Sequence, residues 1–554
     1  MSYERLCETA EQECRDLEKY DGIIYTCGST GCVSSGCQDV IQAITDCIAS
    51  HDIAGRIKLI VTGCMGLCSL GPLVRIELKG REPVLFKQID SLTIRLIILE
   101  YVLQVFRQKD AFVFPYFLEQ FVVPQDLPFF TEQKKIVLAN TGKVDPARIQ
   151  SYIAREGFMA LVKVLSSMTP EALISEMAKS GLRGRSGAGF STAAKWDIAR
   201  KQQAAEKYII CNGDEGDPGA YIDRSLMESD PFSVIEGIII AGFAVGAAKG
   251  WVFIRSEYAL AASRIEQAIE QARDWKLLGN NILGTDFSFD CEVRLGAGTF
   301  VCGEETALIA TMEGKRGTPS HRPPYPAVKG LWTMPTVINN VKTLANIPPI
   351  IRNGADWFRA IGTEGNSGTK VFSITGSALN SGLIEVPMGI SLGRIVYHMA
   401  GVAETGTMVK AVQIGGPSGG ILPPPFFDVK VEYESLRDLG IFIGSGGFII
   451  IDQTVSLLDL LLYYLDFAVD ESCGRCAACR IGSTQVLGVL KKIRKGRGTL
   501  DDLALLERLC MAMKNASLCG LGQAAANPVF STLKYFPEEI EGYITTREVD
   551  THER

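Results

Sequence analysis

The sequence predicts an α/β multidomain protein that ends in a helical bundle. Candidate strands and helices alternate through the largest block of the chain, with glycine-rich turns between them, which is the pattern of an α/β domain. The residues after about 455 are apolar with helical spacing. The length of 554 residues is enough for three or four domains at roughly 150 residues each.

Changes in this pattern define the expected domains. In chain order they are a small α/β unit at 1–105, a linker at 106–135, an α/β nucleotide-binding domain at 136–360, a small β-rich domain at 361–455 and a helical bundle at 456–554. In the first unit, an amphipathic helix over about 3–19 leads to the strand "GIIYTC", a helix near 37–50 and the strand "RIKLIVTGC". A hairpin around "PLVRIELKG" and the helical stretch "SLTIRLIILEYVLQVF" complete it.

The later domains follow from the same kind of evidence. The segment 115–135 carries three prolines, so we expect a connector there. The stretches "GTKVFSITG", "GLIEVPMG" and "VKAVQIGGPSGG" are short strands separated by glycines, which indicates a β-rich domain with one helix. From "SLLDLLLYYLDFAV" onward the pattern is helical and apolar.

Composition narrows the class of protein. The net charge of −7 gives no electrostatic reason to expect nucleic acid. The opening residues are charged and polar, unlike a secretory signal, and the longest apolar stretch, "GIIIAGFAVGAA", is shorter than the ~20 residues that span a bilayer. We therefore expect a cytoplasmic protein without a membrane span. In a reducing compartment, 16 cysteines beside only 4 histidines indicate sulfur-bound metals or redox chemistry.

Four N-terminal cysteines form two close pairs, each at the end of a predicted strand. Cys27 and Cys32 follow the first strand, and Cys64 and Cys68 follow the next. Two loops at one edge of a sheet can supply the four thiolates of a [2Fe–2S] cluster. A zinc site is the alternative, and Cys37 competes with Cys32 as a ligand because it lies five residues further on.

A second set lies near the end of the chain, in "ESCGRCAACRIG" and "SLCGLGQ". The spacing of Cys473, Cys476 and Cys479 allows one loop to bind three corners of a [4Fe–4S] cluster. The usual nearby fourth cysteine followed by proline is absent, so Cys519 is expected to come from a second loop. Zinc is again the alternative, because four cysteines alone do not identify the metal.

The stretch "SGLRGRSGAGFSTAAKW" predicts a phosphate-binding loop. Gly184, Gly187 and Gly189 give G-x-x-G-x-G, and cationic residues flank a loop that opens a helix. Such a loop can also be a surface turn that binds nothing. The candidate ligand-binding residues beside the three glycines are Arg185, Phe190 and Lys195.

Three further stretches place amides and carboxylates where strands or loops lead into helices. They are "CNGDEGDPGAY", "GAGTFVCGEETAL" and "VINNVKTL". Such side chains suit the ring edge and ribityl hydroxyls of a flavin, which need many directed hydrogen bonds. The candidates are Asn212, Asp214, Glu215, Asp217, Gly303, Glu304, Glu305, Asn339, Asn340 and Thr343.

Taken together, these motifs resemble the flavin- and NADH-binding (diaphorase) subunit of respiratory complex I and its relatives in NAD-linked hydrogenases, formate dehydrogenases and electron-bifurcating complexes. The resemblance covers about residues 136–540 and includes "RGRSGAGF", "PPYPA" and "ESCGRCAAC". The first 100 residues resemble a thioredoxin-like [2Fe–2S] ferredoxin. Ser186, Phe300 and Tyr325 depart from the usual pattern, and "AAC" replaces "TPC", but no ligand is lost.

The resemblance implies a cofactor set and a site. It implies that FMN binds the Gly184–Gly189 loop and contacts Lys195, Asn212, Asp214, Glu215, Gly303, Glu304, Asn339, Asn340 and Thr343. It implies that NADH stacks on the flavin near Phe190, Glu305 and Tyr325. It also implies a β-grasp-like (SLBB) domain at 361–455 and a [4Fe–4S] helical bundle.

The expected function is that of an NADH-oxidising or NAD⁺-reducing subunit of a larger redox complex. FMN accepts hydride and passes single electrons to iron–sulfur clusters and then to iron–sulfur or catalytic partner subunits. One alternative is an electron-bifurcating subunit with ferredoxin as a second acceptor, and a more distant one is a zinc-stabilised scaffold without catalysis. We also hypothesise that Glu305 repels the 2′-phosphate of NADPH.

Overall fold

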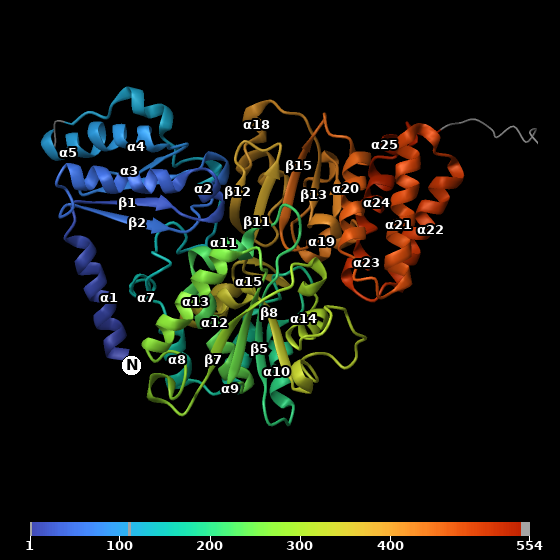
Figure 1. Cartoon of the computed structure of the whole chain (residues 1–554), viewed down its shortest axis with the longest axis horizontal. Coiled ribbons are helices and arrows are strands. Elements are labelled where there is room, and N and C mark those ends of the chain that lie inside the picture. Colours follow the sequence, from blue (N-terminus) through green and yellow to red (C-terminus); the bar gives the residue numbers. More distant parts are fainter. Residues whose placement is uncertain (1–2, 109–111, 545–554) are drawn as a thin grey trace, which may run out of the picture.

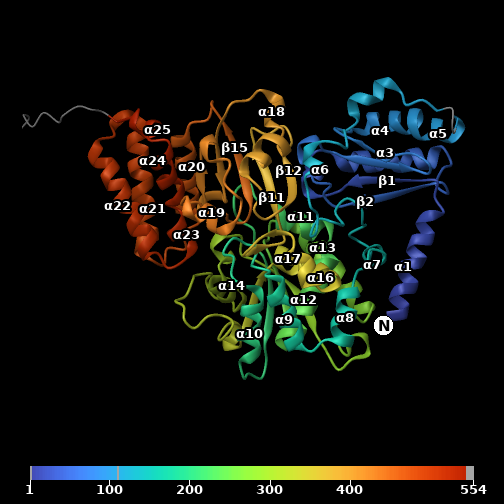
Figure 2. The same ribbon diagram turned by 180° about the vertical axis from the view of Figure 1, so that it is seen from behind.

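The computed structural model describes residues 3–108 and 112–544. Figure 1 shows four parts. The N-terminal unit and the small β-rich unit lie side by side, the large α/β unit lies below them, and the C-terminal helices pack beside the β-rich unit. The view from behind in Figure 2 has the same arrangement. The predicted α/β multidomain class is confirmed, while the exact domain boundaries stay predictions, and residues 109–111 and 545–554 lie outside the described chain.

The N-terminal unit is an α/β unit around a four-stranded sheet in the order β2-β1-β3-β4. Strands β1 and β2 are parallel, and the β3–β4 hairpin continues the sheet antiparallel to β1. Both cysteine pairs follow the carboxyl ends of β1 and β2, at one edge of the sheet, as predicted. Its elements are α1 (Tyr3–Glu18), β1 (Gly22–Cys27), α2 (Thr30–Ser34), α3 (Cys37–Ser50), β2 (Ile57–Thr62), β3 (Val74–Leu78), β4 (Val84–Phe86), α4 (Ser91–Ile97) and α5 (Leu103–Gln108).

The segment after residue 111 packs closely along its length. It runs along the edge of β4, where Val123 N–H donates to Leu85 O at 2.8 Å, and it buries Leu118 and Phe129. Short helices follow this segment and lead to the large sheet. The helices of this region are α6 (Pro128–Thr131), α7 (Ile149–Ile153), α8 (Met159–Ser167) and α9 (Pro170–Ser180).

The large unit contains a parallel sheet in the order β7-β6-β5-β8. The apolar stretch "GIIIAGFAVGAA" lies mostly in α12, which is buried on nearly every face and packs against β5 and α15. Because all four strands are parallel, their carboxyl ends meet at one edge, where ligands of open α/β sheets bind. Its elements are α10 (Thr192–Lys201), β5 (Tyr208–Gly213), α11 (Ile222–Ser229), α12 (Pro231–Val245), β6 (Lys249–Ile254), α13 (Ala259–Asp274), β7 (Asp290–Leu295), α14 (Glu305–Met312), β8 (Thr336–Asn340), α15 (Val341–Ala345), α16 (Ile347–Asn353) and α17 (Ala355–Arg359).

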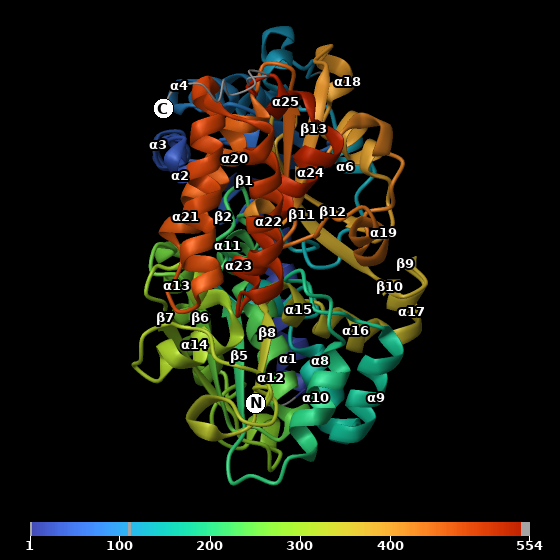
Figure 3. The ribbon, with the colours of Figure 1, turned by 90° about the vertical axis from the view of Figure 1, so that its right-hand side faces the viewer.

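The β-rich unit is a five-stranded mixed sheet in the order β12-β11-β15-β13-β14. Figure 3 shows this sheet between the C-terminal helices and the N-terminal unit, with the parallel sheet beneath it. Each of its strands has a glycine at one end or directly beside it, which matches the expected alternation of short strands and turns. Its elements are β9 (Gly362–Thr363), β10 (Asn366–Ser367), β11 (Thr369–Gly376), β12 (Gly382–Pro387), α18 (Val402–Thr405), β13 (Val409–Ile414), β14 (Gly420–Leu422), α19 (Tyr433–Asp438) and β15 (Gly447–Asp452).

The C-terminal residues form the predicted helical bundle. Its long helices α20, α21 and α22 pack on one another around a core that includes Leu461, Leu490 and Cys510. Within the described residues, no helix combines the length and apolar character required to cross a bilayer. The bundle consists of α20 (Leu457–Asp470), α21 (Ala477–Lys492), α22 (Leu500–Ala516), α23 (Gly520–Ala524), α24 (Asn527–Tyr535) and α25 (Glu538–Glu541).

One buried carboxylate attaches the segment directly after the connector to the β-rich unit. The Glu385 carboxylate, on β12, accepts hydrogen bonds from the N–H groups of Ile136, Val137 and Leu138 at 2.8, 3.0 and 2.8 Å. Its side chain is fully buried, and burial raises its pKa. Three consecutive N–H groups of this segment therefore depend on one side chain that lies far along the chain.

We predict that Glu385→Ala lowers the free energy of unfolding by about 3 kcal/mol or more, because three buried N–H groups lose their acceptor. Glu385→Gln keeps one acceptor oxygen and should cost less. Thermal unfolding of both variants beside the exposed control Glu404→Ala measures this. A melting temperature for Glu385→Ala equal to that of the control would contradict the assignment.

Candidate flavin and iron–sulfur site

The glycine-rich loop lies between two helices whose ends are set by local sequence. Helix α9 is capped by Thr169 and ends at Gly181, whose φ of 68° favours glycine. Helix α10 follows Ser191, whose hydroxyl accepts a hydrogen bond from a backbone N–H of its first turn. Gly184 N–H donates to Phe190 O at 2.8 Å, so the loop is closed at its base.

Residues of the β-rich unit and of helix α15, which follows β8, form hydrogen bonds with this loop. The Tyr433 hydroxyl donates to Gly184 O at 2.8 Å, and Lys370 Nζ donates to Arg185 O at 2.7 Å. The Arg185 N–H donates to Thr343 Oγ1 at 2.9 Å. The shape of the loop thus depends on residues that are distant in sequence.

The loop also presents hydrogen-bond donors that have no protein acceptor. Gly187 has a φ of 125°, and a Cβ at this position would lie 2.8 Å from Gly444, so only glycine fits. Across the described chain, no N–H group of residues 186–190 has an aligned acceptor, nor do Nε and Nη1 of the buried Arg185. Grouped backbone donors bind anions, so the loop fits the phosphate of an FMN.

Amides and carboxylates from three loops meet at the carboxyl edge of the parallel sheet. Asn212 and Asn340 are partners across β5 and β8. The Asn212 amide donates to Gly303 O at 2.8 Å and accepts from Asp214 N–H at 3.0 Å. The Asn340 amide donates to Asp223 at 2.6 Å. The edge predicted from sequence is therefore one connected hydrogen-bond network.

Charged side chains surround the start of α14. Lys195 forms an ion pair with Glu305 and donates to Ile338 O at 3.0 Å. Arg322 lies 3.8 Å from Glu304 and 3.9 Å from Glu305. Two cations and two carboxylates therefore lie beside the glycine-rich loop, where a nucleotide would bring its own charges.

Two aromatic rings stand exposed near this edge. Phe190 is 53% exposed and Tyr325 is 57% exposed, and the Arg322 guanidinium lies 6.0 Å from the Tyr325 ring centre. Exposed aromatic faces can stack on flat ligands. The role of both rings in nicotinamide nucleotide binding stays a prediction.

Further predicted site residues also bind protein groups. The Glu215 carboxylate accepts from three N–H groups at the start of α11. Asn339 accepts from the Trp196 indole at 2.9 Å, and Asp217 accepts from the Ser445 hydroxyl at 2.6 Å. These hydrogen bonds hold the three side chains against protein groups, so they fix the structure around the site.

The structure also adds residues that the sequence analysis did not select. Lys342 lies 2.8 Å from Asp223, and both side chains are almost fully buried. Lys342 lies in "VINNVKTL", next to residues that were selected from the sequence, so this stretch contained a signal for Lys342 as well. Lys370 and Tyr433 lie in the β-rich unit, and no local sequence pattern pointed to the flavin loop.

Burial changes the protonation of two carboxyl groups at this edge. It raises the pKa of Asp214 to about 7, although Arg255 at 3.5 Å acts in the opposite direction. Burial, together with the nearby Asp223, also raises the pKa of Glu215 to about 7. A protonated carboxyl can donate a hydrogen bond, so these residues can act as donors as well as acceptors near neutral pH.

The four predicted N-terminal thiols converge. The sulfur atoms of Cys27 and Cys32 are 2.9 Å apart, and those of Cys64 and Cys68 are 3.6 Å apart. Cys27 also interacts with Cys64. In the described chain Cys37 is buried at the start of α3 with no thiol partner, so this arrangement favours Cys32 as the ligand.

The surroundings of these thiols suit a cluster. The Gly66 N–H donates to the Cys64 sulfur at 3.3 Å, and such N–H donors stabilise cluster sulfur. The same loops contact α11, where Ser229 accepts from Cys64 N–H at 2.8 Å and Glu228 accepts from Thr30 N–H at 3.0 Å. A Cβ at Gly63 would lie 2.2 Å from Ser229, so the contact is close.

The C-terminal thiols lie at the starts of two helices and in the loop before the first of these helices. Cys476 precedes α21, Cys479 lies in its first turn, and Cys519 precedes α23. A Cβ at Gly522 would lie 2.8 Å from the Cys479 Cβ, so glycine allows the two helices to approach. Burial raises the pKa of Cys519 to about 11, and two backbone N–H groups reach its sulfur. Metal binding would supply the positive charge that such a thiolate requires.

In the parts of the chain that the structure describes, no three Cys, His, Asp or Glu side chains are placed to hold a single metal ion. The N–H groups beside Cys64 and Cys519 are the kind of donor that stabilises the sulfur of an iron–sulfur cluster.

A single short turn connects the C-terminal thiols to the flavin edge. The 3₁₀ turn Phe300–Gly303 accepts the Asn212 amide on one side. On its other side Val301 packs in one apolar cluster with Cys519 and Phe300. The Phe300 N–H donates to Glu471 at 2.8 Å, beside the cysteine loop.

The raised pKa of Asp214 has a measurable consequence. A carboxyl with a higher pKa in the folded state holds extra protons when folded, so its contribution to stability falls as pH rises from about 4 towards 7. We predict that in flavin-free protein Asp214→Asn reduces the loss of melting temperature between about pH 5 and about pH 7. The exposed control Asp286→Asn should not. Equal pH dependence in Asp214→Asn and parent protein would refute the assignment.

Comparison with known proteins agrees with this site. The family model described as the Nuo51 FMN-binding domain matches residues 177–349, and that of the NADH-ubiquinone oxidoreductase-F iron-sulfur binding region matches residues 459–543. A crystal structure of an NAD⁺-reducing [NiFe]-hydrogenase matches with a TM-score of 0.66 at 30% identity. The match covers 96% of this chain and 86% of that one.

Several relatives match this chain over most of their own length. The NADP-reducing hydrogenase subunit HndC of Solidesulfovibrio fructosivorans is 49% identical over 424 residues, which cover 76% of this chain and 86% of that protein. An NADH-quinone oxidoreductase subunit of Rhizobium meliloti is 41% identical over 417 residues, covering 75% and 99%. The corresponding protein of Escherichia coli is 37% identical over 409 residues, covering 74% and 92%. The chain therefore belongs to the family of flavin- and NADH-binding subunits that includes these NADH-quinone oxidoreductase proteins.

Proposed function

We propose that this chain oxidises NADH, or reduces NAD⁺, as the flavoprotein subunit of a larger redox complex. The observation that carries the proposal is the turn Phe300–Gly303, which contacts the flavin edge through Asn212 and the Cys519 region through Val301. One turn thus joins the expected two-electron site to the expected one-electron site. A bound flavin supplies the exchange between hydride and single electrons.

The residues of the chain position the reactants. The free N–H groups of 186–190 bind phosphate, and the network around Asn212 and Asn340 orients a polar ring edge. Phe190 and Tyr325 offer exposed rings to a nicotinamide nucleotide. No side chain has to act as a nucleophile or base, because binding and orientation are the tasks of the protein.

We assign the choice between NADH and NADPH to Glu305, at the start of α14, and to the neighbouring Arg322. Glu305 would repel a 2′-phosphate, and Arg322 would attract it. HndC is named an NADP-reducing protein, so the balance between these two side chains is expected to set the preference. The role of Glu305 stays a prediction.

The N-terminal thiols are proposed to hold a [2Fe–2S] cluster, and the C-terminal thiols a [4Fe–4S] cluster. The metal ligands are Cys27, Cys32, Cys64 and Cys68 for the first and Cys473, Cys476, Cys479 and Cys519 for the second. We place the subunit in the cytoplasm, which suits sixteen unpaired cysteines. Its proposed partners are NAD(H) and other iron–sulfur or catalytic subunits.

Electron bifurcation with ferredoxin is the second candidate. It is favoured by the position of the two thiol sets, because one reaches the flavin domain through α11 and the other through the turn Phe300–Gly303. Two separate one-electron routes are what two acceptors require.

We predict that Lys370→Met weakens FMN binding about tenfold or more, because Arg185 O loses the buried donor that holds the loop. Titration of flavin-free protein by FMN fluorescence quenching measures the dissociation constant. Lys430→Met, on an exposed lysine of the same unit, is the control. Equal affinities in the two variants would remove Lys370 from the site.

We predict that Cys476→Ser abolishes the [4Fe–4S] EPR signal while NADH still bleaches the flavin. Transfer to a partner or one-electron acceptor should fall strongly, because the exit cluster is lost. The control is Cys510→Ala, which changes a cysteine of the same bundle outside the thiol set. Flavin bleaching and electron transfer should both remain in this variant. Loss of flavin bleaching in Cys476→Ser alone would overturn the proposed division of labour.

A further inference from the structure

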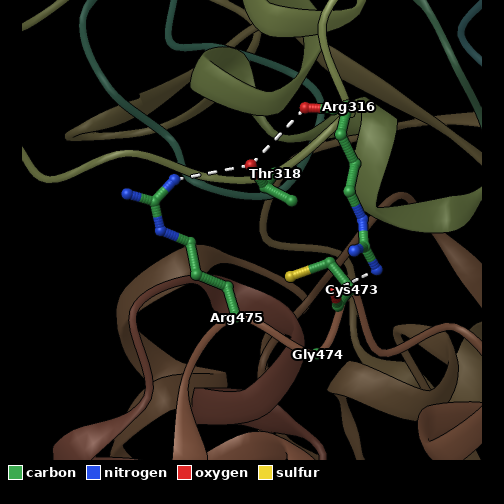
Figure 4. A pocket seen from close by; sticks show the side chains of 5 residues that line it. All are labelled: Arg316, Thr318, Cys473, Gly474 and Arg475. Carbon is green, nitrogen blue, oxygen red and sulfur yellow. Dashed lines mark hydrogen bonds between the residues drawn. The ribbon is translucent and has the colours of Figure 1, made fainter.

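An open cleft of about 270 Å³ lies beside the first cysteine of the C-terminal set. Figure 4 shows its lining residues, Arg316, Thr318, Cys473, Gly474 and Arg475. Arg316 and Thr318 come from the loop after α14, whereas the other three belong to the cysteine loop. The cleft therefore lies where the flavin domain meets the helical bundle.

Two arginines stand on either side of Cys473 and are held in place (Figure 4). Arg316 Nη2 donates to Cys473 O at 2.9 Å. Arg475 Nη1 donates to Thr318 Oγ1 at 3.4 Å. These bonds use only part of each guanidinium, which carries five N–H donors. Both arginines are exposed, so their remaining donors face solvent.

These arginines are not neutralised by the protein. Among the described residues, no carboxylate lies within ion-pair distance of Arg316 or Arg475. A third exposed arginine, Arg480, donates to Gly474 O at 2.6 Å and likewise has no carboxylate partner in the described chain. Three positive charges thus surround the cysteine loop of a protein whose net charge is −7.

We propose that this cleft docks an acidic segment of a partner electron-transfer protein, whose Asp or Glu carboxylates pair with Arg316 and Arg475. The inference rests on the proposed function, in which the [4Fe–4S] cluster passes electrons out of the chain. Guanidinium groups match carboxylates in a two-point geometry, and the arginines are already oriented by their bonds to Cys473 O and Thr318 Oγ1.

The position of the cleft suits electron exit. Cys473 is partly exposed, while Cys479 and Cys519 are buried. A partner bound over Cys473 would approach the cluster from its accessible side. In each encounter the cluster is oxidised by one electron and the redox centre of the partner is reduced by one electron.

The test measures binding of an acidic plant-type [2Fe–2S] ferredoxin, used oxidised as the probe, to the holoenzyme by thermophoresis. The double variant Arg316→Glu/Arg475→Glu should weaken binding about tenfold or more at low salt, because two favourable charge pairs become repulsive. The matched control Lys495→Glu/Arg497→Glu makes the same change in net charge on exposed residues of the same bundle and should have a much smaller effect.

The outcomes separate this inference from the proposed function. Equal weakening in both double variants, or no binding of the probe to the parent protein, would overturn the docking surface. If Arg475→Gln, the milder variant, loses binding and also has an altered cluster EPR spectrum, the arginines act on the cluster itself. That result would also overturn the docking surface. Failure of NADH to reduce the cluster in the parent protein would instead contradict the proposed function, whatever the binding result.

Discussion

The buried ion pair between Lys342 and Asp223 is the contact around which the site is arranged. A lysine with 1% of its side chain exposed is stable as a cation only because Asp223 lies at 2.8 Å and Glu215 at 3.7 Å. The same Asp223 accepts the Asn340 amide at the edge of the parallel sheet. Removal of one partner would leave an uncompensated buried charge, which typically costs about 3–5 kcal/mol.

Through this pair, helix α11 is placed between two parts of the redox site. At its start, Glu215 accepts three of its N–H groups, so the helix is tied to a flavin loop. At its end, Ser229 and Glu228 bind the loops that carry the N-terminal thiols. The turn Phe300–Gly303 connects the other thiol set to the flavin edge, because it contacts Asn212 and packs with Cys519. Each thiol set is therefore held at a fixed place relative to the flavin edge, as short-range electron transfer requires.

The β-rich unit supports the flavin loop, although it contributes none of the motifs that predict flavin binding. Its Tyr433 and Lys370 bind carbonyl groups of the glycine-rich loop. A glycine-rich loop needs such support, because glycine loses the most conformational freedom on folding. The packing of Gly187 against Gly444 shows how closely the two backbones meet.

The sequence by itself determined the order of elements, the glycine-rich loop and both cysteine sets, because these depend on residue spacing within short stretches. It also selected Asn212 and Asn340 as candidate contacts of one flavin, and the structure makes them partners across two parallel strands. Tertiary structure alone turned Glu215 and Asn339 towards protein partners and brought Lys370 beneath the loop. These contacts join residues far apart in the chain, and their partners follow from packing and burial, which local sequence does not encode.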